Sequence, residues 1–466
     1  MLSVSREEIT SGSLTRSLVV LAVPLVIQNL VQVVQNVVDT FWLGRLGENA
    51  VAAVGLVLPV ITLVLALVIG VMTGTQVLVS QRAGDENVRG ARKAAFHGVT
   101  LGLGVGSALA VAIALVSTDV TALLTSHDAV AGLAASYLTV YAASFAVSGV
   151  SDSLEAGFIG FGDSRAALYV NVVAVLVNVV LDPFLIFGYG PFPELGVEGA
   201  ALASVLGYGS GMVLAIGLLA MNRHDFTFTR RTLAVDLADY RELVTIGYPN
   251  ALQHSARHTA RLLIVAIVAS ASGAAGLAAY TVGARIAAIA YIPAFGLQQA
   301  AQSVVGQNLG AEKPGRADRV TWIGVSIAVT GLLAIGALQA LVPGELTRLF
   351  VPDLSPLGFQ LTVDYLQILA LGYWAIGAMS MFTAAFNGAR RTRTSMVATM
   401  IQFWGVRLPI AAVGGLFLAA GVHAVFWSVT ISNVVAAVGA GLYYVYATNR
   451  GMFDRAAETA SGTPGD

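Results

Sequence analysis

The chain is a tandem repeat, because residues about 226 positions apart match along most of its length. Gly47 corresponds to Gly273 at this offset, and Pro183 corresponds to Pro409. Further matched pairs are Ala52 with Ala278, Gly70 with Gly296, Gln76 with Gln302, Gly162 with Gly388 and, after a slip of one residue, Pro24 with Pro249 and Gly196 with Gly421. An offset that persists through glycines and prolines predicts two copies of one helical bundle, with a functional site inside or between them.

The composition places both copies in a membrane. Hydrophobic residues make up 56% of the 466 residues and charged residues only 11%, and the mean hydropathy is +0.78. Soluble chains carry about 25% charged residues. The lack of cysteine excludes disulfides, thiol redox chemistry and iron–sulfur ligation. A net charge of −1 gives no reason to expect a nucleic-acid partner. We therefore expect a polytopic protein whose surroundings are the lipid bilayer.

Twelve apolar runs reach the length of about 20 residues that a helix needs to cross the hydrocarbon. The first six lie at 14–43, 52–78, 91–117, 129–160, 164–188 and 195–221. The second six lie at 241–270, 274–306, 316–342, 360–388, 391–418 and 421–449. The predicted fold is all-α, with 12 transmembrane helices in two pseudo-symmetric six-helix bundles. Because six is even, both bundles enter from the same side and form a parallel repeat.

The distribution of basic residues predicts the domains and their orientation. We expect an N-lobe at 1–221, a cytoplasmic connector at 222–240, a C-lobe at 241–449 and a mobile cytoplasmic tail at 450–466. Of the 25 Lys and Arg residues, 19 fall on the cytoplasmic side if the N-terminus does. The positive-inside rule then places both termini in the cytoplasm. The chain is expected to be a multi-pass monomer of the cell membrane.

A pair of carboxylates stands at matching depth in the first bundle. Asp39 lies five residues before Gly44, and Asp182 lies six residues before Gly188, so both are roughly 8 to 9 Å below the outer helix ends. Charges inside a membrane are costly and mark function by default. The alternative is that Asp39 ends a helix at the headgroups and Asp182 bonds local backbone.

Two neutral oxygens accompany these carboxylates. Asn178 precedes Asp182 by one helical turn, and Ser204 lies about eight residues into the sixth span. Two carboxylates, an amide and a hydroxyl are hard ligands suited to Na⁺, and paired carboxylates can also share a proton. We therefore predict a coupling-cation site at Asp39, Asn178, Asp182 and Ser204, where the ion is H⁺ or Na⁺ or both.

The second bundle does not repeat these acids, since Val265 and Leu408 stand at the corresponding positions. A second acidic pair, Asp152 and Glu155, also belongs to the first bundle alone. Spaced i to i+3, these two share one helix face. They are predicted to line a cavity, and the alternative is a helix end that cytoplasmic water reaches.

The seventh span carries a basic stripe made of His254, Arg257, His258 and Arg261. Their spacing puts all four on one helix face. The stripe is predicted to line a cavity, where it pairs with acids, binds an anionic lipid or substrate, or faces the inner half of a central cleft. Metal binding by the two histidines is disfavoured, because the adjacent arginines repel a cation. Arg407 either joins this cluster or snorkels to the interface.

No enzyme constellation occurs in the sequence. Nothing resembles a Walker loop, a nucleophile elbow or an acid-rich diphosphate motif. Gly102, Gly104 and Gly106 lie inside an apolar span and are interpreted as helix-packing positions. We expect neither catalysis nor a cofactor.

Four segments resemble the multidrug and toxic compound extrusion (MATE) family, and the resemblance covers nearly the whole chain. They are PLVIQNLVQVVQNVVDTFWLGRLG at 24–47, NVVLDP at 178–183, GVEGAA at 196–201 and VGQNLG at 305–310. The resemblance is to the archaeal and DinF-like branches in particular. It implies an antiporter that exports organic cations or other small amphipathic compounds by alternating access, driven by inward H⁺ or Na⁺.

The family pattern carries over to single positions. Asp39 matches the first-span acid, Asn178 and Asp182 match the fifth-span pair, and Ser204 matches a hydroxyl position of the sixth span. The resemblance also implies that Pro24 is the hinge of the first span, because proline removes a helical hydrogen bond.

Departures from the family pattern place the coupling in the first bundle. Arg257 stands where the NorM-like branch has an acid, the tenth-span acid of that branch is missing, and Gln35 stands where tyrosine is common. Gln35 is expected to line the cavity near the ion. The alternative function is a lipid or lipid-linked oligosaccharide flippase of the same superfamily, whose basic stripe receives a phosphate. A membrane scaffold or enzyme without gradient dependence is the third class.

Overall fold

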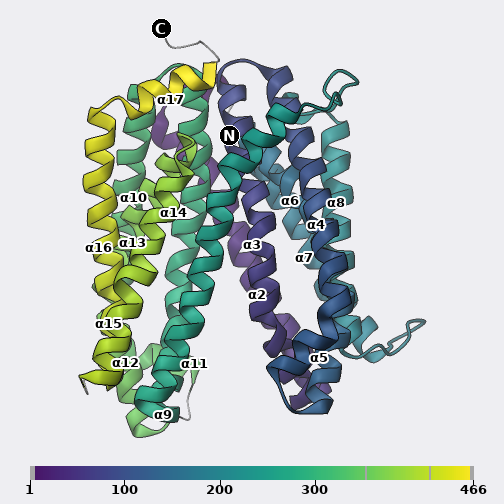
Figure 1. The fold of residues 1–466 in the computed structure, drawn as a ribbon, viewed down its shortest axis with the longest axis vertical. Helices are drawn as coiled ribbons and strands as arrows, with labels where there is room; N and C mark the ends of the chain where they lie inside the picture. Colours follow the sequence, from purple (N-terminus) through teal and green to yellow (C-terminus); the bar gives the residue numbers. More distant parts are fainter. Residues whose placement is uncertain (1–5, 352–353, 419–420, 462–466) are drawn as a thin grey trace. The chain divides into compact units, whose positions relative to one another are not determined.

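The computed structural model describes residues 6–351, 354–418 and 421–461, which form helices and no strand (Figure 1). The all-α prediction is confirmed. The first six spans correspond to α2 (Leu14–Leu46), α3 (Glu48–Gly84), α4 (Val88–Leu124), α5 with α6 (Asp128–Tyr141 and Ala143–Gly160), α7 (Ser164–Phe187) and α8 (Val197–Ala220). The seventh and eighth spans are the two halves of α9 (Leu237–Gly310), the ninth is α10 (Pro314–Leu341), and the tenth is α12 with α13 (Pro356–Ala370 and Tyr373–Gly388). The eleventh is a run of four short helices, α14 (Thr392–Met400), η2 (Ile401–Arg407), α15 (Leu408–Ala412) and η3 (Val413–Phe417). The twelfth is α16 (Gly421–Asn449). Shorter elements are α1 (Arg6–Ser11), η1 (Arg223–Asp225), α11 (Pro343–Phe350) and α17 (Met452–Ser461).

Most of these helices are long and apolar enough to cross a membrane. Nine qualify among the described residues, or up to 11 if each of two bent pairs is one span. The bent pairs are Ala275–Ile289 with Tyr291–Gly310, at 43°, and α12 with α13, at 48°. The predicted span at 241–270, which carries the basic stripe, is helical but does not qualify by composition. The twelve-helix architecture fits these elements.

The repeat is visible in the backbone as well as in the sequence. Gly47 and Gly273 both have positive φ, at 115° and 59°, and they separate the first span from the second and the seventh from the eighth. Glu86 and Glu312, again 226 residues apart, have φ of 58° and 55°. Left-handed backbone is rare outside glycine, so its recurrence at this offset shows that both halves use the same turns.

The chain divides into two compact units, and each unit takes the first turns of a helix that mostly belongs to the other. Unit 1 contains the chain up to Gly12 and Val23–Ala251. Unit 2 contains Ser13–Ala22 and the chain from Leu252 onward. The division falls next to Pro24 in α2 and two residues after Pro249 in α9, at the matched prolines of the repeat.

Unit 1 is held together by close helix crossings around α6, which packs on α3, α4, α7 and α8. A Cβ added to Gly102 would lie 2.1 Å from the Gly149 carbonyl oxygen, and one on Gly106 would lie 2.2 Å from the Phe145 oxygen. Small residues let helices approach this closely. The packing role is confirmed for these two glycines, whereas Gly104 has nothing within 4 Å and was wrongly assigned one.

The connector at 222–240 is anchored to unit 1. Phe226 is fully buried and stacks on Phe161 at a centroid distance of 5.1 Å. Lys93 Nζ lies 2.6 Å from Asp236 Oδ2, and its hydrogen bond and charge lower the pKa of Asp236. Arg223 pairs with Asp163, which raises the pKa of the guanidinium. The connector is therefore a packed segment of unit 1.

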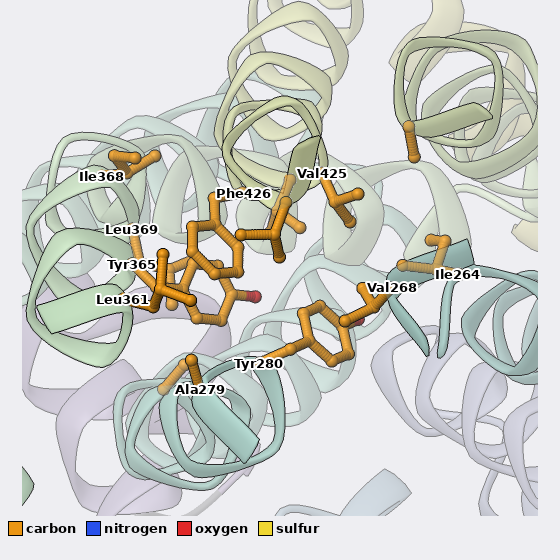
Figure 2. Close-up of a cluster of buried hydrophobic side chains, with 14 of the residues drawn as sticks. Ile264, Val268, Ala279, Tyr280, Leu361, Tyr365, Ile368, Leu369, Val425 and Phe426 are labelled. Carbon is orange, nitrogen blue, oxygen red and sulfur yellow. The ribbon is translucent and has the colours of Figure 1, made fainter. Parts of the chain in front are cut away.

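Unit 2 has an aromatic core built from α9, α12 and α16 (Figure 2). Tyr365 stacks on Phe426 at 4.2 Å and on Tyr280 at 5.6 Å. In the tail at 450–466, expected to be mobile, Met452–Ser461 instead form α17 against α10 and α16, and residues 462–466 lie outside the described residues. The amphipathic spacing of its buried residues, which include Met452 and Phe453, accounts for this difference.

Candidate functional site

One face of α2 carries a row of polar side chains through an otherwise apolar helix. Gln28, Gln32, Gln35 and Asp39 are spaced four, three and four residues apart, which keeps them on one face. Gln32 Nε2 donates to Gln35 Oε1 at 2.8 Å. Gln35 is 8% exposed and contacts the Asn178 side-chain amide of α7 at 2.8 Å. The first and fifth predicted spans therefore meet through amide groups.

Asn178 connects the α2 row to α8. Its amide lies 3.4 Å from the Ser204 hydroxyl in one orientation. Turned over, its nitrogen donates to Asp39 Oδ1 at 3.0 Å and its oxygen accepts from the Ser204 backbone N–H at 3.2 Å. We favour the second orientation while Asp39 is ionised, because two facing oxygens would repel each other. The structure thus brings Asn178 within hydrogen-bonding distance of both Asp39 and Ser204.

Asp182 completes this cluster. Its carboxyl lies within hydrogen-bonding range of the Asp39 carboxyl and is 1% exposed, whereas Asp39 is half-buried. Both Asp182 oxygens are buried and have no donor among the described residues. Two carboxylates in contact repel each other unless a proton or a cation lies between them. This arrangement is therefore suited to holding H⁺ or Na⁺.

The second acidic pair lies on α6 in the same unit. Glu155 is buried and accepts a hydrogen bond from Gln28 Nε2 at 2.9 Å. Asp152 is half-buried near Tyr208 of α8, whose hydroxyl is within hydrogen-bonding range of Tyr141. Gln28 and Gln32 are one turn apart, so the α2 row extends from Glu155 to Asp39. This row was missed in the sequence, although its helical spacing was a visible signal.

The four residues of the predicted basic stripe differ in their exposure. His254, Arg257 and His258 are half-buried, whereas Arg261 is exposed. All four belong to unit 2, and the acidic residues belong to unit 1. Among the described residues no group of three or more His, Cys, Asp or Glu side chains could hold a metal ion. Pro24 is buried inside α2, which continues through it.

Arg407 at the end of η2 is the buried arginine of unit 2, at 7% exposure. It donates from Nε to Ser432 Oγ at 2.8 Å and from Nη2 to Asn433 Oδ1 at 2.6 Å. Burying a charge without a counter-ion costs several kcal/mol. Its cation–π contact with Phe403, at 4.2 Å, returns about 0.5 to 2 kcal/mol. The neutral partners orient Arg407 without neutralising it.

These features define a class of protein. Two repeated bundles of membrane-spanning helices, one of which encloses a polar cluster below the ends of its helices, are characteristic of a secondary transporter. The MatE family model matches residues 24–184 and 252–413, one segment in each half. The chain belongs to the MATE family.

Named relatives agree with this assignment. The probable multidrug resistance protein NorM of Bradyrhizobium diazoefficiens is 30% identical over 411 residues, which cover 84% of each chain. The FAD transporter of Shewanella oneidensis is 25% identical over 442 residues, which cover 94% of this chain and 96% of that one. Among solved structures, an outward-facing multidrug resistance MATE transporter of the MOP superfamily superimposes with a TM-score of 0.89 at 23% identity, covering 97% of this chain and 99% of the other.

Family membership fixes the coarse function. MATE proteins are ion-coupled membrane transporters that need no cofactor, and they are not enzymes. The chain is therefore a multi-pass membrane transporter of small molecules, homologous to multidrug efflux proteins.

Proposed function

We propose that the protein is an antiporter that exports organic cations or other amphipathic drugs in exchange for inward H⁺ or Na⁺, with the coupling site in unit 1. The observation that carries this proposal is the contact between Asp39 and Asp182, with both Asp182 oxygens buried and without a donor from the described part of the chain. A bound proton or Na⁺ removes the repulsion between the carboxyls. When the ion leaves, the negative charge attracts a cationic solute, so ion and solute compete for one region.

In this proposal, the side chains of Asn178 and Gln35 respond to whether Asp39 is ionised or a cation is bound. A primary amide can present either its N–H or its oxygen. With Asp39 ionised, the Asn178 nitrogen faces the carboxylate at 3.0 Å. With a cation bound, the amide oxygen can turn to the cation and join the Ser204 hydroxyl as a neutral ligand. We propose that this reorientation passes to α2 through the 2.8 Å contact with Gln35.

Pro24 is the proposed hinge of α2, since the proline leaves the carbonyl four residues earlier without its helical partner. The two proposed lobes are residues 1–221 and 241–449, joined by 222–240. We further assign the protein to the archaeal and DinF-like branch, with both termini in the cytoplasm of a cell membrane, and propose a monomer. The excess of Lys and Arg in the predicted cytoplasmic segments supports that orientation.

The test is dye efflux from proteoliposomes that contain the purified protein, under H⁺ and Na⁺ gradients imposed separately. We expect efflux with at least one gradient, and collapse of that gradient by an ionophore should stop it. Movement under only one of them identifies the coupling ion. Efflux at the same rate without any gradient would contradict the antiport mechanism.

The second candidate, a lipid or lipid-linked oligosaccharide flippase, is favoured by Arg257 and Arg407 in unit 2. One relative is named a FAD transporter, and FAD carries two phosphates, so solutes with phosphate groups belong in the transport assay beside cationic dyes. The acidic cluster of unit 1 favours the antiporter of cations. Gradient-independent movement of a lipid pyrophosphate would support the flippase instead.

A further inference from the structure

Two arginines of unit 2 flank one aromatic ring. The Arg407 guanidinium carbon lies 4.2 Å from the centroid of the Phe403 ring, and that of Arg257 lies 5.9 Å from it. Arg257 comes from α9, while Phe403 and Arg407 come from η2. η2 is a π-helix inside a predicted span, and π-helical turns occur frequently at functional sites. Two different elements, α9 and the π-helix η2, therefore each bring an arginine to the Phe403 ring.

The groups that hold Arg407 are all neutral. Ser432 and Asn433 of α16 accept its hydrogen bonds, and Gln402 Nε2 also donates to Asn433 Oδ1, at 2.8 Å. Asn433 thus faces two donors and fixes the direction of the guanidinium. A guanidinium stays charged in proteins. The arrangement orients the positive charge and leaves it uncompensated.

No carboxylate balances this charge within the described part of unit 2. Asp364 pairs with His423 at 3.0 Å, and Asp318 accepts from the Tyr444 hydroxyl at 2.7 Å. Neither Arg257 nor Arg407 forms an ion pair with a described residue, and Arg257 Nε is buried without a hydrogen-bond partner. Cation–π contact with Phe403 offsets only part of the cost of burying the Arg407 charge near a second, half-buried arginine. An anion would offset the remainder.

The surroundings indicate what the anion is attached to. Leu408, the residue after Arg407, packs against the apolar cluster of Tyr365, Phe426 and their neighbours, which Figure 2 shows. An arginine guanidinium can donate two parallel hydrogen bonds to the oxygens of a phosphate group. We propose that Arg257 and Arg407 form a binding site in unit 2 for the phosphate group of an amphipathic molecule, whose apolar part lies along this cluster. The site does not depend on the proposed ion coupling in unit 1.

Binding of dodecyl phosphate to the purified full-length protein in detergent tests this site, with dodecyltrimethylammonium as the probe of opposite charge. Arg257→Gln and Arg407→Gln are each expected to weaken dodecyl phosphate binding at least tenfold, because each removes a charged donor. Arg348→Gln is the matched control and should bind as the wild type does. Arg348 also lies over a phenylalanine ring of unit 2, Phe359 at 5.2 Å, but it is exposed.

A third variant separates binding from folding. Asn433→Asp places a carboxylate beside Arg407 Nη2, at the 2.6 Å contact. This internal counter-ion should weaken dodecyl phosphate binding as strongly as Arg407→Gln does, without lowering the melting temperature. Asp39→Asn should leave binding unchanged, so that a failure of the coupling mechanism does not affect this result. Unchanged binding in Arg257→Gln, Arg407→Gln and Asn433→Asp, or equal binding of dodecyltrimethylammonium, would overturn the proposal.

Two competitors distinguish the possible sources of the phosphate. Dioleoyl phosphatidic acid in mixed micelles represents a membrane lipid, and inorganic phosphate represents a free anion. Displacement of dodecyl phosphate by the lipid at tenfold lower concentration would assign the site to a lipid headgroup. Displacement by inorganic phosphate would assign it to a soluble phosphate compound. Displacement by neither, at saturating concentration, would contradict a phosphate site.

Discussion

A buried carboxyl group needs a donor, a proton or a cation at its oxygens, and Asp182 has no donor among the described residues. The neighbouring Asn178 faces Asp39 and Ser204. The carboxyl oxygens of the cluster that lack a donor are therefore those of Asp182, which contacts Asp39. At this scale the site is a pair of acids whose contact requires a third, positive partner.

Gln28 offers a test of the polar row on α2. Gln28→Leu removes the donor from the buried Glu155 carboxyl, and an unsatisfied buried group costs about 1 to 3 kcal/mol. We expect a lower melting temperature for the purified protein. Adding Glu155→Gln should recover part of the loss, because the acid that needed the donor is gone. Additive losses in the double variant would show that the 2.9 Å contact contributes nothing to stability.

Sequence alone predicted the residues that the structure brings together in unit 1, because depth along a helix follows from residue number. Asp39, Asn178 and Asp182 meet through the α2 and α7 faces as that argument required. The cavity-lining role of the basic stripe stays a prediction. Helical periodicity placed Arg261 beside Arg257, yet Arg261 is exposed. Periodicity gives a shared face, and only the packing of neighbouring helices decides which part of that face is buried.

At the scale of elements, α2 serves two roles that meet at Pro24. Its first turns, Ser13–Ala22, group with unit 2, and its remainder groups with unit 1 and carries the polar row. A helix that belongs to two units can transmit a change at Asp39 only if it bends or turns as a body. Pro24 lies two residues after the division and supplies a weakened point.

Pro24→Ala tests this hinge. Alanine restores the missing N–H and favours the helix, since proline inside a helix costs about 3 kcal/mol. We expect a raised melting temperature and gradient-driven efflux reduced several-fold. Pro59→Ala in α3 is the matched control, because Pro59 is also inside a long helix but not at the division between units. Undiminished efflux in Pro24→Ala would rule out a hinge at this residue.

At the scale of the whole molecule, duplication preserved the turns and not the chemistry. The positive-φ pairs Gly47 with Gly273 and Glu86 with Glu312 recur at the offset of 226 residues. The acids do not recur, since Val265 and Leu408 replace Asp39 and Asp182. Leu408 instead follows Arg407, so the second half carries a positive charge one residue before the position that corresponds to Asp182. Unit 1 therefore buries acidic residues such as Asp182, and unit 2 buries Arg407.

Repeat, spans and helix content followed from the sequence because hydrophobic length and matched glycines are local signals. Three features did not follow. Ser13–Ala22 group with unit 2, the tail forms α17, and η2 adopts π-helical geometry. The amphipathic spacing of the tail indicates a helix, but its packing on α10 and α16, like the other two features, depends on contacts with distant segments.

The most direct test of the account is efflux by Asp39→Asn and Asp182→Asn in proteoliposomes, compared with Asp119→Asn. Each amide abolishes one charge of the pair, so neither variant can hold the coupling cation between two carboxyls. Asp119 is an exposed acid of α4 outside the cluster and serves as the control. We predict that both cluster variants lose gradient-driven efflux at least tenfold while remaining folded, and that Asp119→Asn keeps it. Full gradient-driven efflux in Asp39→Asn or Asp182→Asn would contradict coupling at this site.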